Sequence, residues 1–515
     1  MTSAPTTFNA VDYLLGRHDG DRLAVRCGEE SLTYEGLRVL TRRVAAGFRA
    51  LGVRPEERVM LCMADGVELL TGILGAMYLG AVPVPVSTMV TGVELASVLV
   101  DSRARVLCVS VEFAAAARLA AGVASEVEHV VVDGDVDLPG VVHPWADLTS
   151  VTGLAESYRT WPDSPALWLY TSGTTGVPKG AMHRHGSIRD VAELYGIGVL
   201  GLTEADRCLS VAKLFFAYGL GNSALFPLAV GATTILERAR PTPALIAQRA
   251  RETRPTLFFG VPTFYSALLN SDVPDDSFAS VRHGVSAGEP LPAALLQRFR
   301  DRFGVEILDG LGSTEALHIF LSNRPGQVRP GSTGTPVPGY RVELRDEHGA
   351  VLDAAGQPGE LFLSGPSVAT GYWCRTATTR QVFLGEWLRT GDTYVRNEDG
   401  TYTCLGRSND MLKAGGIWVS PAEVEARLVE HPDVAEVAVV ARTDVDGLDK
   451  PVACVVAVAG REIDEAALIA WCREGLASFK RPRAVVTVDE LPKTATGKIR
   501  RNVLRELVAG DAVRT

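Results

Sequence analysis

Alternation between amphipathic helices and short apolar strands is the feature that most constrains how the first half of this chain can fold. Thr33 is suited to cap a helix whose apolar residues keep to one face, and Gly52 is suited to end it. Apolar strands are predicted at residues 59–63 and 105–111, and a helix between them runs through Leu79. Strands that alternate with helices pair in parallel, and the helices pack on both faces of the sheet. We therefore expect a large layered α/β N-terminal domain with parallel-sheet subdomains.

The last hundred residues follow a different pattern. Residues 420–423 read Ser-Pro-Ala-Glu, a capping box with proline at the first helical position. A helix is expected near residues 464–476. Three apolar runs are suited to strands: residues 434–442, 451–458 and 484–488. This pattern predicts a small α+β C-terminal domain.

The boundary between the two domains is predicted just after a hairpin whose turn is residues 397–400, Asn-Glu-Asp-Gly. We therefore assign residues 1–408 to the N-terminal domain and residues 409–515 to the C-terminal domain. Only a few residues form the join, so it is expected to act as a hinge that leaves the small domain mobile.

Charge and apolar content exclude two classes of partner. The chain has 61 acidic and 51 basic residues, a net charge of −10, whereas nucleic-acid binding needs a basic surface. Residues 69–93 carry no charge, but Pro83, Pro85 and repeated glycines favour a buried helix followed by a strand over a membrane span. The first 21 residues lack the pattern of a secretory signal. We expect a cytoplasmic protein with neither nucleic acid nor membrane as a partner.

The eight cysteines lie far apart, between Cys27 and Cys472, and none forms a Cys-x-x-Cys pair. This spacing matches neither a structural metal site nor a redox motif. Reduced and mostly buried thiols are therefore expected.

The strongest local signal is residues 170–180, Tyr-Thr-Ser-Gly-Thr-Thr-Gly-Val-Pro-Lys-Gly, directly after an apolar strand predicted at residues 166–169. Glycines let backbone N–H groups surround an anion, the Ser and Thr hydroxyls donate further hydrogen bonds, and Lys179 adds positive charge. Because no Gly-Lys-Ser/Thr is present here, this is not a Walker A loop. The segment predicts a polyphosphate-binding loop of another kind.

Two other stretches match known motifs. Residues 196–201 fit G-x-G-x-x-G, but they follow a predicted helix at residues 187–195 instead of a strand, so the dinucleotide interpretation fails. Residues 284–288 fit G-x-S-x-G, the nucleophile elbow of α/β-hydrolases. A serine hydrolase using Ser286 is thus an alternative, and His318, His348 and His431 are available as its base. The hydrolase alternative gives the predicted phosphate loop no role.

Five motifs in order resemble those of the adenylate-forming superfamily, which includes acyl- and aryl-CoA synthetases, carrier-protein adenylation domains and firefly luciferase. They are residues 170–180, Gly-Ser-Thr-Glu at 312–315, Arg-Thr-Gly-Asp at 389–392, Gly-Arg at 406–407 and Pro-Lys-Thr-Ala-Thr-Gly-Lys at 492–498. The resemblance runs from about Thr33 to Arg505. Within the superfamily, residues 215–222 and 317–320 look most like benzoate- and hydroxybenzoate-CoA ligases.

The resemblance implies an ATP- and Mg²⁺-dependent aryl acid:CoA ligase, which is an AMP-forming acid-thiol ligase. It would convert benzoate or a substituted benzoate to an acyl-adenylate with release of pyrophosphate, and would then pass the acyl group to coenzyme A. An aryl acid adenylation enzyme that loads a carrier protein is the alternative within the superfamily. A monomer or homodimer is expected.

The resemblance also assigns the nucleotide-binding residues. The β- and γ-phosphates would be bound by Thr171, Ser172, Gly173, Thr174, Thr175 and Lys179. Glu315 would hold Mg²⁺, and Thr314 would contact the α-phosphate. The adenine would be lined by Ser286, Ala287, Gly288, Glu289, Asp309, Gly310 and Leu311. Leu311 stands where the wider family usually has an aromatic residue. Asp392 can accept from both ribose hydroxyls, and Arg407 can donate beside it.

The C-terminal residues would serve both half-reactions. The resemblance makes Lys498 the catalytic lysine of adenylation, bridging the attacking carboxylate and the α-phosphate as a point charge. Rotation of the small domain about Asn409, where relatives commonly carry Asp or Lys, would then bring Gly415 and Gly416 to the thiol channel. The basic residues Lys480 and Arg481 are candidates for the CoA phosphates, with a plain surface patch as the alternative.

Six residues are candidates for the acid pocket: Phe216, Ala217, Tyr218, Gly219, His318 and Ile319. Small Ala217 and Gly219 leave room for a flat ring, while aromatic and aliphatic walls bury it. His183 and His185 have no acidic neighbours in the sequence, and we interpret them as structural and not as a metal pair.

Overall fold

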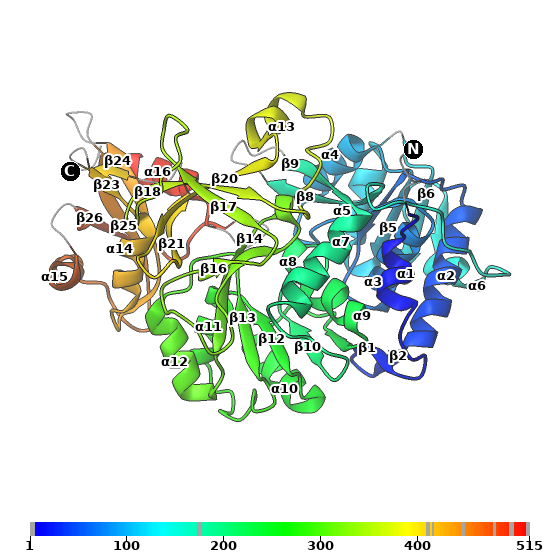
Figure 1. Ribbon diagram of the computed structural model, residues 1–515, viewed down its shortest axis with the longest axis horizontal. Coiled ribbons are helices and arrows are strands. Elements are labelled where there is room, and N and C mark those ends of the chain that lie inside the picture. Colours follow the sequence, from blue (N-terminus) through cyan, green and yellow to red (C-terminus); the bar gives the residue numbers. More distant parts are fainter. Residues whose placement is uncertain are drawn as a thin grey trace.

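The computed structural model shows a large layered region that carries a smaller group of helices and strands at one end (Figure 1). The described residues are 6–124, 126–172, 178–407, 412–414, 417–443, 449–476, 480–493 and 499–510.

One parallel sheet confirms the predicted alternation in the first half of the chain. Its order is β4-β3-β5-β6-β7, and all neighbours are parallel. The strands are β3 (Arg58–Cys62), β4 (Val82–Pro85), β5 (Val106–Ser110), β6 (His129–Asp133) and β7 (Val142–Pro144). The helices are α2 (Tyr34–Ala50), α3 (Val67–Tyr78), α4 (Gly92–Ser102), α5 (Ala114–Ala121) and α6 (Trp145–Ser150). As predicted, the Thr33 side chain caps α2 by accepting from the N–H of Gly36, at 3.1 Å.

The two faces of this sheet belong to different cores. Val59 and Leu61 of β3 pack with α2 and α3, whereas Met60 and Cys62 pack with α4 and α5. Successive side chains of a strand point to opposite faces, so a strand buried on both faces is apolar throughout. This explains why residues 59–63 form a continuous apolar run.

A second sheet places the ends of several strands at one edge. Its order is β16-β15-β14-β13-β12-β10-β11-β1-β2, with parallel pairing from β14 to β1. The strands are β1 (Leu23–Cys27), β2 (Glu30–Thr33), β10 (Arg207–Ser210), β11 (Thr233–Leu236), β12 (Leu257–Gly260), β13 (His283–Ser286), β14 (Ile307–Gly312), β15 (Ile319–Ser322) and β16 (Thr335–Pro336). The helices around it are α1 (Ala10–Leu15), α7 (His185–Val191), α8 (Ala217–Leu220), α9 (Phe226–Val230), α10 (Pro243–Thr253), α11 (Pro262–Leu269) and α12 (Ala293–Phe303). In open parallel sheets, ligands bind outside the carboxyl ends of the strands.

Two antiparallel units complete the large region. The hairpin of β8 (Pro165–Ser172) and β9 (Pro178–Arg184) stands as a separate two-stranded ribbon. An antiparallel sheet joins β17 (Arg341–Arg345), β18 (Pro358–Ser364), β19 (Phe383–Leu384), β20 (Trp387–Arg396) and β21 (Tyr402–Arg407), and α13 spans Thr376–Val382. The turn between β20 and β21 confirms the predicted hairpin.

The C-terminal elements confirm a small α+β unit with its own packing. Strands β24 (Val434–Thr443), β25 (Asp449–Ala457) and β26 (Ala484–Thr487) form its sheet, and β22 (Leu412–Ala414) pairs with β23 (Ile417–Val419). The helices are α14 (Pro421–Val429), α15 (Glu465–Gly475) and α16 (Arg501–Gly510). Separate apolar clusters line its two sheet faces.

The predicted capping box at α14 is half formed. The Ser420 side chain accepts from the Glu423 N–H at 3.3 Å, as predicted. The Glu423 carboxylate does not close the box, because it accepts instead from the Lys480 ammonium at 2.6 and 2.7 Å. An ion pair between distant segments has replaced a local hydrogen bond.

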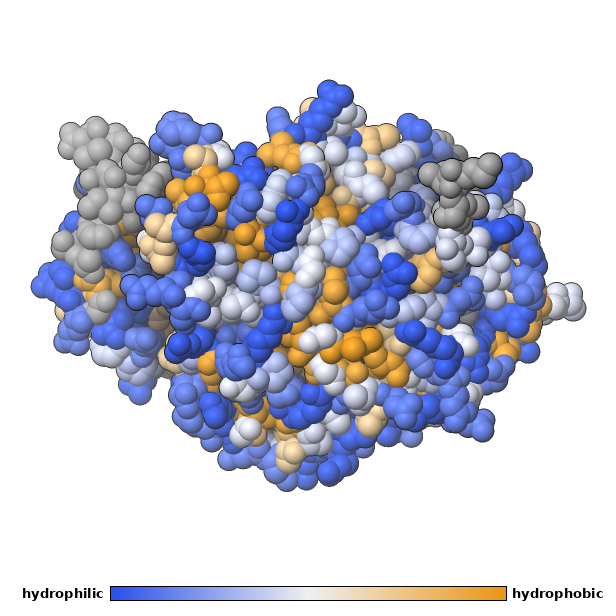
Figure 2. All heavy atoms as spheres, viewed as in Figure 1, coloured by the Kyte–Doolittle hydropathy of each residue, from blue (hydrophilic) through white to orange (hydrophobic). Residues whose placement is uncertain are grey.

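The uncharged stretch at residues 69–93 forms most of α3 and all of β4, both buried. Within the ranges given above, no helix is both long and apolar enough to cross a bilayer. On the face shown in Figure 2, hydrophilic side chains are spread throughout, with separate apolar areas between them. The structure describes all eight cysteines, and each is a free thiol.

Candidate active site

The predicted phosphate loop joins β8 to β9 at the tip of their hairpin. Thr171 lies opposite Lys179 in the register. The side chain of Ser172 and the predicted ligands Gly173, Thr174 and Thr175 lie outside the described residues. The Lys179 ammonium lies 5.5 Å from the centre of the Tyr372 ring, within the range of a cation–π contact.

Residues 369–373, here called the clasp, bind the phosphate hairpin through backbone hydrogen bonds. The N–H of Trp373 donates to the carbonyl of Gly180 at 2.9 Å. The N–H of Met182 donates to Gly371 at 3.0 Å, and Met182 in turn accepts from Thr370 at 2.9 Å. The clasp also donates from Ala369 N–H to the Glu315 carbonyl at 2.8 Å. It therefore holds the hairpin and the residue 313–316 turn together.

The turn that carries Thr314 and Glu315 is fixed from several sides. The Ser313 side chain accepts from the N–H of Ala316 at 3.1 Å, and the Thr314 carbonyl accepts from His183 Nε2 at 2.8 Å. Leu317 directly after it has φ of 66°, in the left-handed region that a leucine rarely adopts. Such strain persists where surrounding contacts over-determine the backbone, and it clusters at functional sites.

The Glu315 carboxylate has one side-chain partner in the described part of the chain. The Tyr372 hydroxyl donates to Glu315 Oε1 at 2.6 Å. Among the described residues, no group of three or more His, Cys, Asp or Glu side chains could hold a metal ion by itself. Any cation here would need further oxygen ligands from a bound molecule or from water.

Asp392 and Arg407 are brought together by the β20–β21 hairpin, in which they face each other in the register. Arg407 Nη1 lies 3.1 Å from Asp392 Oδ1 and also donates to the Thr390 carbonyl at 3.0 Å. The Asp392 side chain is mostly buried while that of Arg407 is half exposed. The pair therefore presents a positioned carboxylate beside a positive charge.

The carboxyl ends of β13 and β14 hold two buried polar atoms that lack a protein partner. Ser286 and Asp309 face each other in the register of these strands. Ser286 Oγ and Asp309 Oδ1 are both buried, and neither has a hydrogen-bond partner in the part of the chain that the structure describes. Burial raises the pKa of Asp309 well above its usual value. Unpartnered buried polar atoms are costly, and a ligand with donors and acceptors would satisfy them.

The other residues predicted to line the adenine lie around this edge. Ala287 is buried, and Gly288 has φ of 95°, which favours glycine there. A Cβ on Gly310 would lie 2.9 Å from Cγ2 of Ile319, so only glycine fits between the strands. Leu311 is partly buried against the core.

The predicted acid pocket is built around His318. Its Nε2 donates to Asn222 Oδ1 at 3.1 Å and to the Tyr218 carbonyl at 3.3 Å, because both neighbours are acceptors. The imidazole packs edge-on against Phe226, with ring centres 4.4 Å apart. Burial lowers the pKa of His318 to about 3, so its ring is neutral at physiological pH. Ile319, the next residue, is also buried.

Tyr218 ties the short helix α8 to the sheet edge. Its hydroxyl reaches the carbonyl oxygens of Val285 at 2.9 Å and Gly260 at 3.1 Å. Phe216 directly precedes α8 and is partly exposed, while Ala217 and Gly219 are buried. The candidate pocket residues of α8 and of β15 therefore converge on the carboxyl ends of the parallel strands.

Two polar residues of the site were not predicted from the sequence. Among the described residues, neither Asn222 Nδ2 nor His318 Nδ1, both buried, has a partner within hydrogen-bond distance and geometry. Asn222 lies in the segment that resembles aryl-CoA ligases, but its type alone indicated no role. Tyr372 was missed because its contacts to Lys179 and Glu315 depend on segments far apart in the chain.

The basic residues predicted for CoA already have protein partners. Lys480 pairs with Glu423, and Arg481 Nε donates to the Leu476 carbonyl at 2.9 Å. These contacts give both side chains a structural role in the small domain. The hinge Asn409, the channel glycines Gly415 and Gly416, and Lys498 lie outside the described residues.

The Ser286 hydrolase alternative does not fit this geometry. A nucleophile elbow exposes its serine on a sharp turn and places a histidine within hydrogen-bond reach. Here Ser286 is fully buried, and its hydroxyl contacts no hydrogen-bonding partner. The G-x-S-x-G match is therefore the end of a parallel strand.

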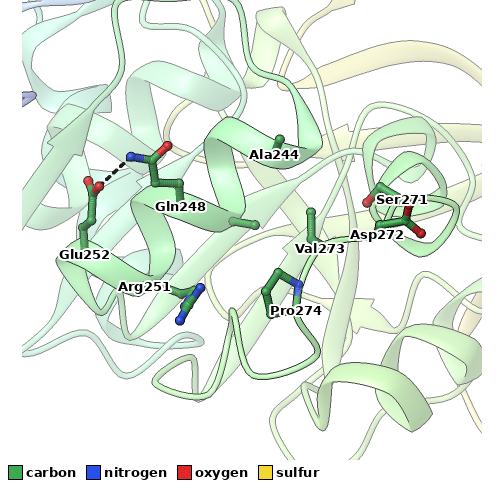
Figure 3. A pocket seen from close by; sticks show the side chains of 9 residues that line it. Ala244, Gln248, Arg251, Glu252, Ser271, Asp272, Val273 and Pro274 are labelled. Carbon is green, nitrogen blue, oxygen red and sulfur yellow. Dashed lines mark hydrogen bonds between the residues drawn. The ribbon is translucent and has the colours of Figure 1, made fainter.

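A surface groove lies away from these residues. Figure 3 shows it between α10 and the segment 271–274, with the hydrogen bond from Gln248 to Glu252 along its wall. Its volume is about 690 Å³. It is lined by Ala244, Ala247, Gln248, Arg251, Glu252, Ser271, Asp272, Val273 and Pro274. None of these is a predicted site residue, so the groove is separate from the site.

His185 has a structural role, as predicted. Because it is buried and neutral, it should make the stability of the protein depend on pH under acidic conditions. Its Nδ1 accepts from the N–H of Ala10 at 3.1 Å, and burial lowers its pKa from 6.5 to about 4. Because the unfolded chain takes up this proton first, stability is lost as pH falls from 6.5 to about 4. The expected loss is about 1.4 kcal/mol per pH unit.

In His185→Asn, the side-chain oxygen can still accept from Ala10, but no proton is taken up. We expect its free energy of unfolding to fall less steeply with acid than that of the wild type. Denaturant unfolding at pH 6.5 and pH 5 measures the difference, which should amount to about 2 kcal/mol. The exposed His348→Asn variant is the control. Equal slopes for wild type and His185→Asn would contradict a neutral buried His185.

Comparison with known proteins agrees with this geometry. The family model described as AMP-binding enzyme matches residues 15–373, and the model described as AMP-binding enzyme C-terminal domain matches residues 423–498. The chain is 46% identical to a benzoate–CoA ligase of Thauera aromatica, with 97% of this chain and 96% of the relative covered. It is 41% identical to a 4-hydroxybenzoate–CoA/benzoate–CoA ligase of Rhodopseudomonas palustris, covering 97% and 93%.

A crystal structure of a benzoate CoA ligase from Burkholderia xenovorans LB400 superposes with a TM-score of 0.90 at 43% identity. It covers 97% of this chain and 100% of that one. The fold is therefore shared along nearly the full length. The chain belongs to the AMP-binding, adenylate-forming enzyme family.

Proposed function

We infer that this chain is an AMP-forming aryl acid:CoA ligase. The observation that carries the inference is the contact between the predicted adenine edge and the predicted acid pocket. Gly310 of β14 packs directly against Ile319 of β15, so close that a Cβ would not fit. An enzyme that joins a carboxylate to AMP needs its acid site to adjoin its nucleotide site, and this contact places the two candidate sites side by side. Full-length similarity to benzoate- and hydroxybenzoate-CoA ligases supports it.

The proposed reaction proceeds in two steps, adenylation and thioester formation. A carboxylate oxygen attacks the α-phosphorus of ATP, the bond to the β-phosphate oxygen breaks, and pyrophosphate leaves. The CoA thiolate then attacks the acyl carbon, and AMP leaves with the oxygen it gained. The protein acts mainly by positioning the reactants and neutralising charge.

Several of the predicted ATP residues have surroundings that support the roles proposed for them. The tip of the β8–β9 hairpin with Lys179 binds the β- and γ-phosphates. Asp392, partly buried and beside Arg407, accepts from the ribose hydroxyls. Ser286 and Asp309 supply unpartnered polar atoms toward adenine. Thr314, fixed by the strained turn, contacts the α-phosphate.

Glu315 fits the role of a magnesium ligand that arrives with ATP. Magnesium keeps several waters and is held in such sites by one or two carboxylates together with substrate phosphates. Glu315 supplies a carboxylate, and Tyr372 occupies only one of its oxygens. When bound, the ion would neutralise phosphate charge during transfer.

The acid pocket favours an uncharged aromatic ring. Its proposed walls are Tyr218, Ile319 and the imidazole of His318, which is neutral because burial lowers its pKa to about 3. Gly219 and Ala217 add little bulk. We therefore assign benzoate or a simply substituted benzoate as the acid.

The second step is assigned to the small C-terminal domain, with the boundary between residues 408 and 409. Lys498 would serve adenylation, and rotation about Asn409 would exchange it for the channel glycines Gly415 and Gly416. Coenzyme A is the acceptor that the similar ligases name, and an aryl acid adenylation enzyme that loads a carrier protein is the alternative. We place the enzyme in the cytoplasm as a monomer or homodimer.

The test is AMP formation by the purified protein with ATP and Mg²⁺, using benzoates, cinnamates and fatty acids with and without CoA. We expect AMP to form in step with an aryl-CoA product and benzoates to be preferred. Acid-dependent pyrophosphate exchange that is unaffected by CoA would favour a carrier-protein acceptor. No acid-dependent turnover of ATP would contradict the proposal.

Ser286→Ala separates the ligase from a hydrolase. The change removes a buried hydroxyl beside adenine but no nucleophile, so kcat should stay within about threefold of the wild type, the scale of one neutral hydrogen bond. The KM for ATP should rise modestly. Loss of all turnover, together with esterase activity in the wild type, would support the hydrolase. Aryl-CoA formation and hydrolysis of an aryl ester are the two measurements.

A further inference from the structure

We propose that Tyr372 is a positioning residue that sets the spacing between the carboxylate of Glu315 and the ammonium of Lys179. This inference rests on the proposed function, in which these two groups receive Mg²⁺ and the ATP phosphates. It assigns one side chain to hold both charges in place before the nucleotide binds.

The hydroxyl of Tyr372 orients the Glu315 carboxylate. It donates to Oε1 at 2.6 Å, within the range of a hydroxyl hydrogen bond to a charged acceptor. The bond occupies one oxygen and leaves Oε2 available to a cation. Residues that orient a metal ligand in this way commonly change metal affinity by about 10–100-fold when they are removed.

The ring of the same tyrosine lies beside Lys179. The ammonium is 5.5 Å from the ring centre, so the negative face of the ring attracts it. Without this contact, a lysine on a strand has a flexible four-carbon stem and samples several positions. The hydroxyl and the ring thus act on opposite charges at the same time.

The tyrosine itself is firmly held. Its side chain is buried and packs edge-on against Phe383, with ring centres 5.4 Å apart. Its N–H donates to Thr379 Oγ1 at 3.0 Å, and its backbone pairs with Ala181 of the phosphate hairpin. The other hydrogen bonds of the clasp fix it on both sides. A firmly held tyrosine between two side chains of opposite charge is the geometry that preorganisation requires.

Tyr372→Phe keeps the ring and removes only the hydroxyl. We expect the affinity for Mn²⁺, measured by electron paramagnetic resonance in the presence of a non-hydrolysable ATP analogue, to fall about 10-fold. The Mg²⁺ concentration for half-maximal adenylation should rise by a similar factor. The KM for the acid, and thioester formation from supplied adenylate, should stay unchanged.

Tyr34→Phe is the matched control, because it removes an equally buried hydroxyl that donates to the Ala232 carbonyl at 2.7 Å. It should lower the melting temperature similarly while leaving Mn²⁺ affinity unchanged. A merely structural Tyr372 would give the same result as this control. Mn²⁺ affinity of Tyr372→Phe equal to that of the wild type would overturn the inference.

A double-mutant cycle tests whether Tyr372 acts on Mn²⁺ binding through Glu315. In the Glu315→Gln background, Tyr372→Phe should cause no further loss of Mn²⁺ affinity, since the oriented carboxylate is already gone. Independent losses of the two variants would contradict the inference. Because Mn²⁺ binding needs no turnover, these results stand apart from the AMP assay, whose failure in the wild type would contradict the proposed function instead.

Discussion

Lys498→Ala should slow formation of the acyl-adenylate by about 10²–10³-fold, the scale observed when one charge-stabilising group is removed from a reaction centre. The lysine is proposed to bridge the attacking carboxylate and the α-phosphate, where negative charge builds up in the transition state. Acid-dependent pyrophosphate exchange measures this half-reaction alone. Thioester formation from supplied adenylate should survive, because the proposed rotation of the small domain would remove Lys498 before the thiol attacks.

Lys493→Ala is the matched control in the same motif. Lys493 is paired with Glu436 at 2.7 Å on the surface of the small domain, so its loss should leave both half-reactions near the wild-type rate. An equal loss of both half-reactions in Lys498→Ala would contradict the division of labour between two domain positions. An unchanged exchange rate would contradict the assignment of Lys498 itself.

Local sequence signals predicted most of the fold correctly. The helix after Thr33, the strands at residues 59–63 and 105–111 and the hairpin around residues 397–400 all have strong local patterns, and the structure confirms each one. Caps, turn residues and apolar periodicity act over a few positions, so a single sequence contains them. The order of strands in the nine-stranded sheet could not be predicted, because it depends on crossovers between distant segments.

The same distinction holds for the site: residues within local motifs could be identified from the sequence, whereas residues defined by contacts with distant segments could not. Asp392 and Arg407 were identified by their motifs, and the hairpin register brings them together. Tyr372 and Asn222 were missed because their roles come from contacts with residues 57 and 96 positions away. The run of basic residues left Lys480 as either a CoA contact or part of a plain surface patch, and the structure adds a pairing with Glu423 that the run did not indicate. A run of basic residues indicates that the side chains are exposed, but it does not indicate which groups they bind.

Gly219→Ala should lower kcat/KM for the aromatic acid by about 10²-fold, since displacing a binding element by about 1 Å can have that effect. A Cβ at this position would lie 2.1 Å from the Lys213 carbonyl oxygen and 2.5 Å from that of Ala212. Both are backbone atoms, so no side-chain rotation relieves the contact. Either α8, which carries Tyr218, or the turn before it must move.

The turn before α8 is held too firmly to give way. The buried Asp65 carboxylate accepts from the N–H of Leu214 at 3.1 Å, and the Lys213 ammonium donates to the Ala239 carbonyl at 2.9 Å. We therefore expect α8 to shift and the Tyr218 hydroxyl to leave the carbonyls of Val285 and Gly260. Stability should fall by about 1–3 kcal/mol, as for other overpacked positions.

The KM for ATP should change little in Gly219→Ala, because the nucleotide residues lie on other elements. Gly36→Ala is the control: its Cβ would meet nothing closer than 3.5 Å inside helix α2, and it should stabilise the protein slightly. Steady-state kinetics with benzoate and with ATP, alongside thermal melts, give the comparison. A fall in ATP affinity equal to that for the acid would mean that α8 does not form the acid pocket. Normal kinetics with benzoate would show that the turn yields despite Asp65 and Lys213.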